Sequence, residues 1–338
     1  MHNKKPKVVR IDRGATVANM DLEAKEIVKM GGVLVSAESS NEEDTIKAGE
    51  DADVIITAAA QITRHVMEKL TNLKAIVRYG IGYDTIDVPA ATDNGVVVVN
   101  IPDFCWEEVS NHAIVLMLAL AKKLVPINNA VKNESWSAGS RLIRPMVSIY
   151  DQTLGIVGCG NIGRRVARKA QCFGMTTIGY DPYVHQKLAR EYGIKLVSNL
   201  HEMLKQCDFV SINPLLNDET LHMIGEREFE QMKPTAYIVN TARGPVIDEK
   251  AMVKALNEKW IAGAGIDVFE QEPSPPENPL FKMDNVIVTP HSAAYSEVSW
   301  GRLRVSVGSE AARIIAGKWP KNIVNKGVKP KVKLIKGD

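Results

Sequence analysis

Short β-branched runs alternate with amphipathic segments along the 338 residues, and this alternation constrains the fold more than any other feature. The runs lie at 8–11, 33–36, 54–57, 75–77 and 96–99, and a second series lies at 154–158, 176–180, 209–213, 236–240, 264–268 and 286–289. Parallel strands require crossover segments of this kind, which are usually helices. The pattern therefore predicts an α/β protein with two doubly wound parallel sheets, and the chain is long enough for two domains.

The segments that do not follow this alternation are expected to form two long helices, an irregular stretch and a C-terminal extension. Residues 106–123 and 295–317 carry apolar side chains at helical spacing and predict two long helices. Residues 135–145, rich in Ser, Gly and Pro, predict an irregular stretch, and the lysine-rich C-terminal tail predicts a solvated extension.

Composition excludes several classes of protein. Lys plus Arg is 42 and Asp plus Glu is 40, so a net charge of +2 gives no reason to expect nucleic acid as a partner. The longest apolar run, 113–121, is about half of a membrane-spanning helix, so no membrane span is expected. Four cysteines without a close pair suggest neither a disulfide framework nor a metal site, and they favour a reducing, cytoplasmic location.

A glycine-rich turn joins the first strand of the second series to a helical segment. Residues 158–163 have the sequence G-x-G-x-x-G. Gly158 allows a tight turn, Gly160 lets the backbone approach a phosphate, and Gly163 permits close packing of helix on strand. The helix start also offers free N–H groups to phosphate oxygens. The turn therefore predicts a dinucleotide-binding site.

Asp181 indicates which dinucleotide is bound. It ends the next strand, 18 residues after Gly163, where a carboxylate accepts hydrogen bonds from the adenosine ribose and repels a 2′-phosphate. This position favours NAD over NADP, although His185 and Lys187 leave some room for the phosphorylated cofactor.

Three polar side chains follow strands of the second series. Arg243, Glu272 and His291 each lie after a predicted strand, and ligands of an open parallel sheet bind at the carboxyl ends of its strands. Singly they suggest a surface ion-pair partner, a loop carboxylate and a structural histidine. Their occurrence at equivalent strand ends instead favours a catalytic set.

Together these motifs resemble those of the D-isomer-specific 2-hydroxyacid dehydrogenase family, which shares its fold plan with the NAD(H)-sensing C-terminal-binding-protein corepressors. The matching segments follow the family's order over nearly the whole chain, at 78–87, 158–163, 240–248, 265–273 and 289–291. The resemblance implies a Rossmann NAD-binding domain at 104–291. This domain is inserted into a flavodoxin-like substrate-binding domain made of 1–103 and 292–338, with the active site in the cleft.

The resemblance also implies catalytic roles for the three strand-end residues. Arg243 would bind the substrate carboxylate and the developing oxyanion with a permanently charged, planar guanidinium. His291 would donate the proton to the carbonyl oxygen, because an imidazole can exchange protons near neutrality. Glu272 would fix the tautomer of that ring and hold it protonated.

Further contacts are expected by resemblance. The expected cofactor contacts are Gly158, Gly160, Asn161, Ile162, Gly163, Asp181, Pro214, Thr241 and Asp267, the last at the nicotinamide carboxamide. The backbone at Ile81 and Gly82 would receive the substrate carboxylate. A homodimer is expected, with apolar side chains in or near the region 106–144: Trp136, Leu142, Ile143 and Met146.

Two local features bear on the function. Some relatives that oxidise phosphoglycerate carry an arginine after the third strand, where this chain has Thr57 followed by three alanines, which argues against a phosphorylated substrate. The corepressors carry a tryptophan shortly after the histidine, where this chain has 293–295, Ala-Ala-Tyr. We therefore expect reduction of a small 2-oxo acid. A corepressor-like binding protein and a formate or phosphite dehydrogenase are the alternatives.

Overall fold

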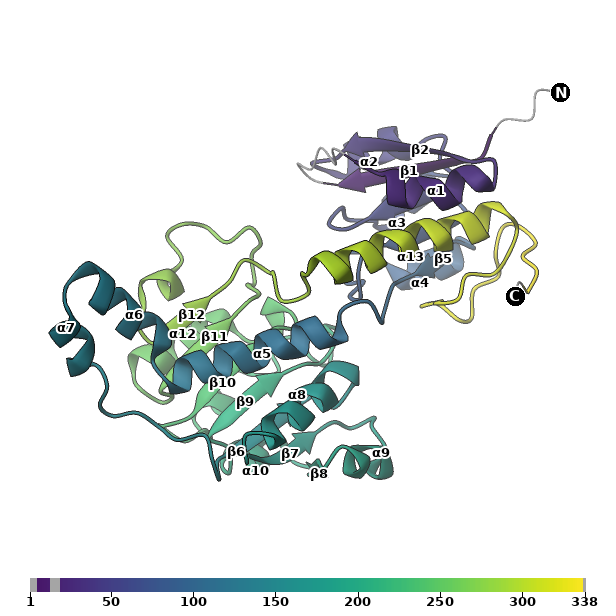
Figure 1. Cartoon of the computed structure of the whole chain (residues 1–338). Coiled ribbons are helices and arrows are strands. Elements are labelled where there is room, and N and C mark those ends of the chain that lie inside the picture. The colour runs from purple at the N-terminus through teal and green to yellow at the C-terminus, as the bar shows by residue number, and fades with distance from the viewer. Residues whose placement is uncertain (1–4, 13–18, 337–338) are drawn as a thin grey trace. The chain divides into compact units, whose positions relative to one another are not determined.

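The computed structural model describes residues 5–12 and 19–336 (Figure 1). The chain divides into two compact units. Unit 1 comprises Met1–Phe104 and Ser296–Asp338, and unit 2 comprises Cys105–Tyr295. The chain returns from unit 2 to unit 1 at Ser296, whereas the sequence analysis placed the start of this returning segment at residue 292.

The described part of unit 1 is built on a parallel sheet of five strands in the order β2-β1-β3-β4-β5. Its strands are β1 (Lys7–Asp12), β2 (Val33–Glu38), β3 (Val54–Thr57), β4 (Ala75–Arg78) and β5 (Val97–Val99). Its helices are α1 (Asp21–Lys29), α2 (Glu42–Gly49), α3 (Arg64–Lys69), α4 (Val88–Asp93) and α13 (Glu297–Ile315). This is the flavodoxin-like strand order, as predicted.

The C-terminal tail is only partly the solvated extension that the sequence predicts: its lysines at 326, 329, 331, 333 and 336 are exposed, but the residues just before them pack on the rest of unit 1. The Val324 N–H donates to Val98 O at 2.9 Å. The buried Asn325 side chain accepts from Val98 N and donates to Val96 O, both at 2.9 Å. The tail therefore covers β5, the edge strand, whose backbone groups would otherwise be unpaired.

Unit 2 is built on a parallel sheet of seven strands in the order β12-β11-β10-β9-β6-β7-β8. Its strands are β6 (Thr153–Val157), β7 (Thr176–Tyr180), β8 (Lys195–Leu196), β9 (Phe209–Ile212), β10 (Tyr237–Asn240), β11 (Gly263–Ile266) and β12 (Val286–Val288). Counted from β6, this is the Rossmann order with one added edge strand, as predicted. The order reverses between β6 and β9, where such sheets bind ligands.

Helices cover both faces of this sheet (Figure 1). These helices are α5 (Trp106–Ala121), α8 (Asn161–Gln171), α9 (Gln186–Glu191), α10 (Leu200–Leu204), α11 (Glu226–Phe229) and α12 (Glu249–Asn257). Two further helices, α6 (Leu124–Asn133) and α7 (Trp136–Arg141), pack on each other beyond the end of α5 (Figure 1). Successive strand residues face opposite sides, so Ile156 packs in the core with α5 and α8, whereas Val157 packs in the core with α10 and α12.

Two helical segments differ from the sequence-based expectation. The stretch predicted to be irregular contains α7, because the Ser135 side chain caps this helix by accepting from Ala138 N at 3.1 Å. The predicted helix at 106–123 ends at Ala121, and α6 follows. No single helix in the described residues is long and apolar enough to cross a membrane, although α5 and α6, bent by 61°, pass that test as a pair.

Candidate functional site

The glycine turn lies between β6 and α8. Gly158 has φ of +82°, and a Cβ there would lie 2.7 Å from Pro214 N, so the loop after β9 packs directly on the turn. A Cβ at Gly163 would lie 2.1 Å from Gly158 O. A Cβ at Gly160 would have no atom of the described part of the chain within 4 Å. Thus Gly158 and Gly163 are required by packing, whereas Gly160 leaves open space at the start of α8.

Asp181 fastens the glycine turn to the loop after β7. One carboxylate oxygen accepts from Cys159 N at 2.8 Å, and the other accepts from Tyr183 N at 2.8 Å and Val184 N at 3.0 Å. Asp181 therefore caps the turn that follows it and also braces the phosphate-binding turn. A carboxylate has about four lone-pair sites, so one remains available on the oxygen that faces the glycine turn. Ribose binding stays a prediction.

These residues fit a bound dinucleotide. Thr241, just after β10, is buried, and its Oγ1 has no hydrogen-bond partner among the described residues. Buried hydroxyls are usually paired, so this oxygen indicates a missing polar partner such as a ligand. The open space at Gly160 and the uncapped start of α8 fit a pyrophosphate in the same way. Asn161 and Ile162, in the first turn of α8, would contribute N–H groups there.

Arg243 lies two residues beyond Thr241. Its backbone O accepts from the buried Asn240 side chain at 2.8 Å, and its guanidinium donates to Ala242 O at 2.8 Å. A Cβ at the next residue, Gly244, would lie 1.9 Å from Phe269 C. The absence of a side chain at Gly244 thus lets the loop after β10 approach the loop after β11.

His291 and Glu272 form a hydrogen-bonded pair. Nδ1 of His291 lies 2.6 Å from Oε2 of Glu272, whose Oε1 accepts from Phe269 N at 3.0 Å. Burial alone would raise the pKa of the Glu272 carboxyl. The hydrogen bond and charge of His291, the Phe269 N–H and the charge of Arg243 together bring that pKa below its usual value. Glu272 is therefore ionised at neutral pH, and Arg243 is close enough to act on it.

Asp267 holds the segment that carries His291. Its carboxylate is fully buried and accepts from Thr289 Oγ1 at 2.5 Å and from Ser292 N and Ala293 N, both at 2.9 Å. Its backbone O accepts from His291 N at 2.7 Å. The predicted contact of Asp267 with a nicotinamide carboxamide stays a prediction, because the visible role of this carboxylate is to bind the loop.

Two further residues of this region were missed at the sequence level. Thr289 bonds Asp267, and His112, on α5, lies with Nε2 2.9 Å from Thr289 Oγ1. The sequence carries little signal for His112, because it follows the polar residues Ser110 and Asn111 in the first half of α5, where a histidine is expected to face solvent.

Ile81 and Gly82 belong to unit 1, in the loop between β4 and α4. The Ile81 O accepts from the Asn100 side chain at 2.8 Å, which holds this loop in place. Their contact with the substrate stays a prediction.

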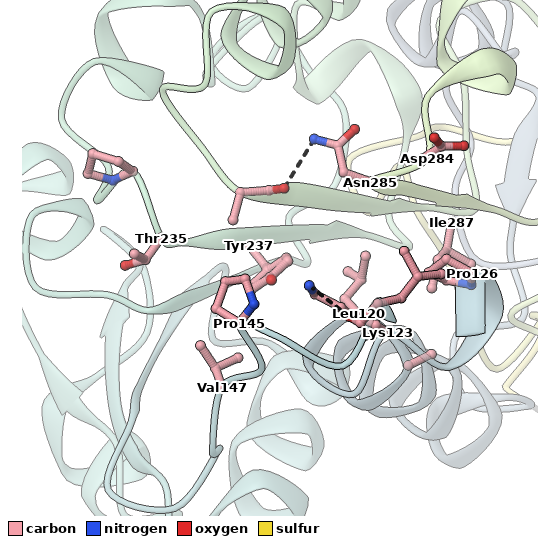
Figure 2. Close-up of a pocket in the computed structure, with 14 residues that line it drawn as sticks. Leu120, Lys123, Pro126, Pro145, Val147, Thr235, Tyr237, Asp284, Asn285 and Ile287 are labelled. Carbon is pink, nitrogen blue, oxygen red and sulfur yellow. Dashed lines mark hydrogen bonds between the residues drawn. The ribbon is translucent and has the colours of Figure 1, made fainter. Parts of the chain in front are cut away.

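A cavity of about 520 Å³ in unit 2 is drawn in Figure 2. Tyr237 starts β10, and Asn285 directly precedes β12, so the cavity borders the amino ends of the strands. Lys123 and Leu142 also line the cavity, and Lys123 Nζ donates to Leu142 O at 3.2 Å. Among the described residues, no group of three His, Cys, Asp or Glu side chains could hold a metal ion.

Comparison with known proteins identifies a family for the chain. The family described as "D-isomer specific 2-hydroxyacid dehydrogenase, NAD binding domain" matches residues 114–293. A glyoxylate reductase of Korarchaeum cryptofilum is 40% identical over 285 residues, covering 84% of this chain and 86% of that protein. A D-3-phosphoglycerate dehydrogenase of Methanocaldococcus jannaschii is 38% identical over 92% of this chain, which spans 59% of that longer relative.

A solved structure gives the same picture. The D-lactate dehydrogenase from Aquifex aeolicus, crystallised with NAD and lactic acid, superposes with a TM-score of 0.83 at 28% identity. The match covers 94% of this chain and 99% of that chain. The likeness thus extends over both units.

The glycines allow a test of the cofactor site. We expect Gly160→Ala to leave the melting temperature unchanged, because a Cβ there meets no protein atom, and to weaken NADH binding about tenfold, or 1.4 kcal/mol. Gly163→Ala is the matched control, which should lower the melting temperature because its Cβ meets Gly158 O. Thermal unfolding and NADH fluorescence titration measure both. Unchanged NADH affinity in Gly160→Ala would contradict the assignment.

Proposed function

The chain belongs to the D-isomer-specific 2-hydroxyacid dehydrogenase family, and we propose that it catalyses the NAD-dependent interconversion of a small 2-oxo acid and its D-2-hydroxy acid. The observation that carries the proposal is the 2.6 Å contact between His291 Nδ1 and Glu272 Oε2. It leaves Nε2 of the ring available to exchange a proton with a substrate. Arg243, whose charge acts on Glu272, supplies the cation that a carboxylate substrate needs.

In the proposed reaction, bound nicotinamide supplies or accepts the hydride. Arg243 binds the substrate carboxylate and stabilises the negative charge that develops on the carbonyl oxygen during reduction. His291 donates a proton from Nε2 to that oxygen, and in the reverse direction it accepts this proton. Glu272 acts through His291, because a carboxylate on Nδ1 keeps that nitrogen protonated and stabilises the imidazolium.

We favour an unphosphorylated substrate. After β3, Thr57 Oγ1 accepts from Ala60 N at 3.1 Å, and Asp12 accepts from Ala58 N at 2.8 Å. This loop of unit 1 thus carries alanines at 58–60, where phosphoglycerate-oxidising relatives carry an arginine, and the nearby Arg10 is already paired with Asp12 at 2.8 Å. The glyoxylate reductase at 40% identity also supports a small substrate.

The direct test is a panel of 2-oxo acids: glyoxylate, hydroxypyruvate, pyruvate and 3-phosphohydroxypyruvate. Oxidation of NADH is followed with each acid, and the assay is repeated with NADPH. We expect turnover with NADH and at least one unphosphorylated acid. Failure of every acid with both cofactors would refute the proposed activity, and a preference for 3-phosphohydroxypyruvate would refute the substrate class.

We also propose a cytoplasmic location. The four cysteines are free, and Cys159 and Cys207 are fully buried. Burial raises the pKa of each of these two thiols to about 12, so they stay protonated and unreactive. Free thiols without disulfides are typical of a reducing compartment.

We propose that the chain forms a homodimer through the arm that consists of α6, α7 and the residues just after α7. Trp136 is 80% exposed, and Leu142 and Ile143 are 38% and 46% exposed, which is unusual for large apolar side chains grouped in one segment. A second copy of the chain would bury them. We expect a dimer mass in light scattering at micromolar concentration and dissociation in Trp136→Asp. A monomer mass for the unmodified protein would contradict the proposal.

Arg243→Ala should lower kcat/KM for 2-oxo acid reduction about 100- to 1,000-fold, because the oxyanion loses a charged donor. NADH affinity and melting temperature should change little, since Arg243 lies in the loop after β10 and outside the hydrophobic core clusters of unit 2. Arg227→Ala, at an exposed arginine of α11, is the matched control. A large loss of stability in Arg243→Ala would instead indicate a structural role.

The substitution Glu272→Gln tests whether Glu272 keeps His291 protonated. Because the pKa of Glu272 is lowered, its charge supports the imidazolium throughout the neutral range, and reduction should decline only as pH rises. The neutral amide removes that support, so the alkaline limb for reduction and the acidic limb for oxidation should both move to lower pH. Each pH unit by which a limb moves corresponds to about 1.4 kcal/mol of lost interaction free energy between Glu272 and the His291 imidazolium.

Paired pH profiles of kcat/KM, measured in both directions, check this expectation. Glu270→Gln is the control, since Glu270 lies on the same loop and pairs with His222 Nε2 at 2.9 Å. Its profile should match that of the unmodified protein. If both limbs of the pH profiles stay at the same pH in Glu272→Gln, then Glu272 does not influence the protonation of His291.

A further inference from the structure

We propose that His112 is a positioning residue, which holds the His291 loop in its active conformation through Thr289 and Asp267. This inference rests on the proposed function and extends it to a residue on a different element. His112 comes from the second turn of α5, whereas the loop it reaches follows β12. The two meet because α5 packs on β11 and β12 in unit 2.

The direction of the hydrogen bonds follows from their donors. A threonine hydroxyl has a single proton, and the 2.5 Å contact with the Asp267 carboxylate assigns that proton to the Thr289–Asp267 bond. Thr289 Oγ1 must then accept from His112 Nε2 at 2.9 Å. His112 thus carries its proton on Nε2. That ring nitrogen also lies 3.6 Å from Asp267 Oδ1.

The loop needs such support. His291 has φ of +51°, a left-handed conformation that is costly for a residue with a Cβ and persists where surrounding contacts enforce it. Asp267 supplies those contacts, since its carboxylate binds Thr289 on one side of His291 and Ser292 and Ala293 on the other.

His112 therefore orients the hydroxyl that binds Asp267. Among the described residues, Thr289 Oγ1 bonds the side chains of His112 and Asp267, so without the His112 donor this hydroxyl keeps one of these two partners and can rotate. The His291 ring would still bond Glu272, but its backbone would be held less firmly. Displacement of a catalytic group by about 1 Å can cost 100-fold in rate, so a distant histidine can affect kcat.

The test uses two substitutions that differ in one property. His112→Leu keeps an apolar side chain of similar size and removes the donor, whereas His112→Gln keeps an N–H donor at similar reach. We expect His112→Leu to lower kcat for 2-oxo acid reduction about 10- to 100-fold with little change in KM for NADH, and His112→Gln to recover most of that loss. Backbone hydrogen exchange at 289–293 should be faster in His112→Leu and normal in His112→Gln.

A double variant tests the connection through Thr289. Thr289→Val removes the same hydroxyl, so the effects of His112→Leu and Thr289→Val on kcat should not multiply when combined. The control is His201→Leu, because His201 of α10 also makes one ring hydrogen bond, to Glu228 Oε1 at 2.8 Å. Its kcat and its exchange at 289–293 should be normal.

Three outcomes would overturn the inference: an unchanged kcat in His112→Leu, a loss that His112→Gln does not recover, or effects that multiply in the double variant. Hydrogen exchange separates this inference from the proposed function. If the unmodified protein reduces no 2-oxo acid, the activity fails, yet faster exchange at 289–293 in His112→Leu alone still supports the positioning role. Unchanged exchange rejects it.

Discussion

The site in unit 2 depends on one buried carboxylate. Asp267 is inaccessible to solvent at the end of β11, and a buried charge is costly unless hydrogen bonds replace its lost hydration. The backbone N–H groups of Ser292 and Ala293 and the hydroxyl of Thr289 provide that replacement. The loop must wrap around Asp267 to do so, and the wrapping places His291 beside Glu272. The hydrogen bonds that stabilise the buried Asp267 carboxylate therefore also fix the position of His291, the proposed acid.

Much of this arrangement could be predicted from the sequence, because it follows from local rules. β-branched runs located the strands, and the parallel order places every strand's carboxyl end at one edge. Arg243 therefore had to lie at the same edge as Gly158 whatever the side-chain packing. The spacing of glycines in 158–163 likewise needed no tertiary information, since each glycine answers a local geometric demand.

The remaining features depend on contacts between distant segments, which periodicity does not encode. His112 and Thr289 are 177 positions apart, and nothing near either residue signals the other. The tail was predicted to be solvated because its lysines dominate the composition, yet Val324 and Asn325 attach it to β5. In the same way, the capping of α7 by Ser135 outweighed a composition that favours loops.

The bonds of Asp181 have a consequence for how cofactor preference can change. The carboxylate that is expected to discriminate against a 2′-phosphate also binds Cys159 N in the glycine turn and two N–H groups after β7. A replacement without an acceptor oxygen would release all three donors at once. A side chain that admits the phosphate must therefore also accept hydrogen bonds from the backbone, which Asn or Ser can do and a long cationic side chain cannot. Cofactor selectivity and the shape of the glycine turn are thus coupled through one side chain.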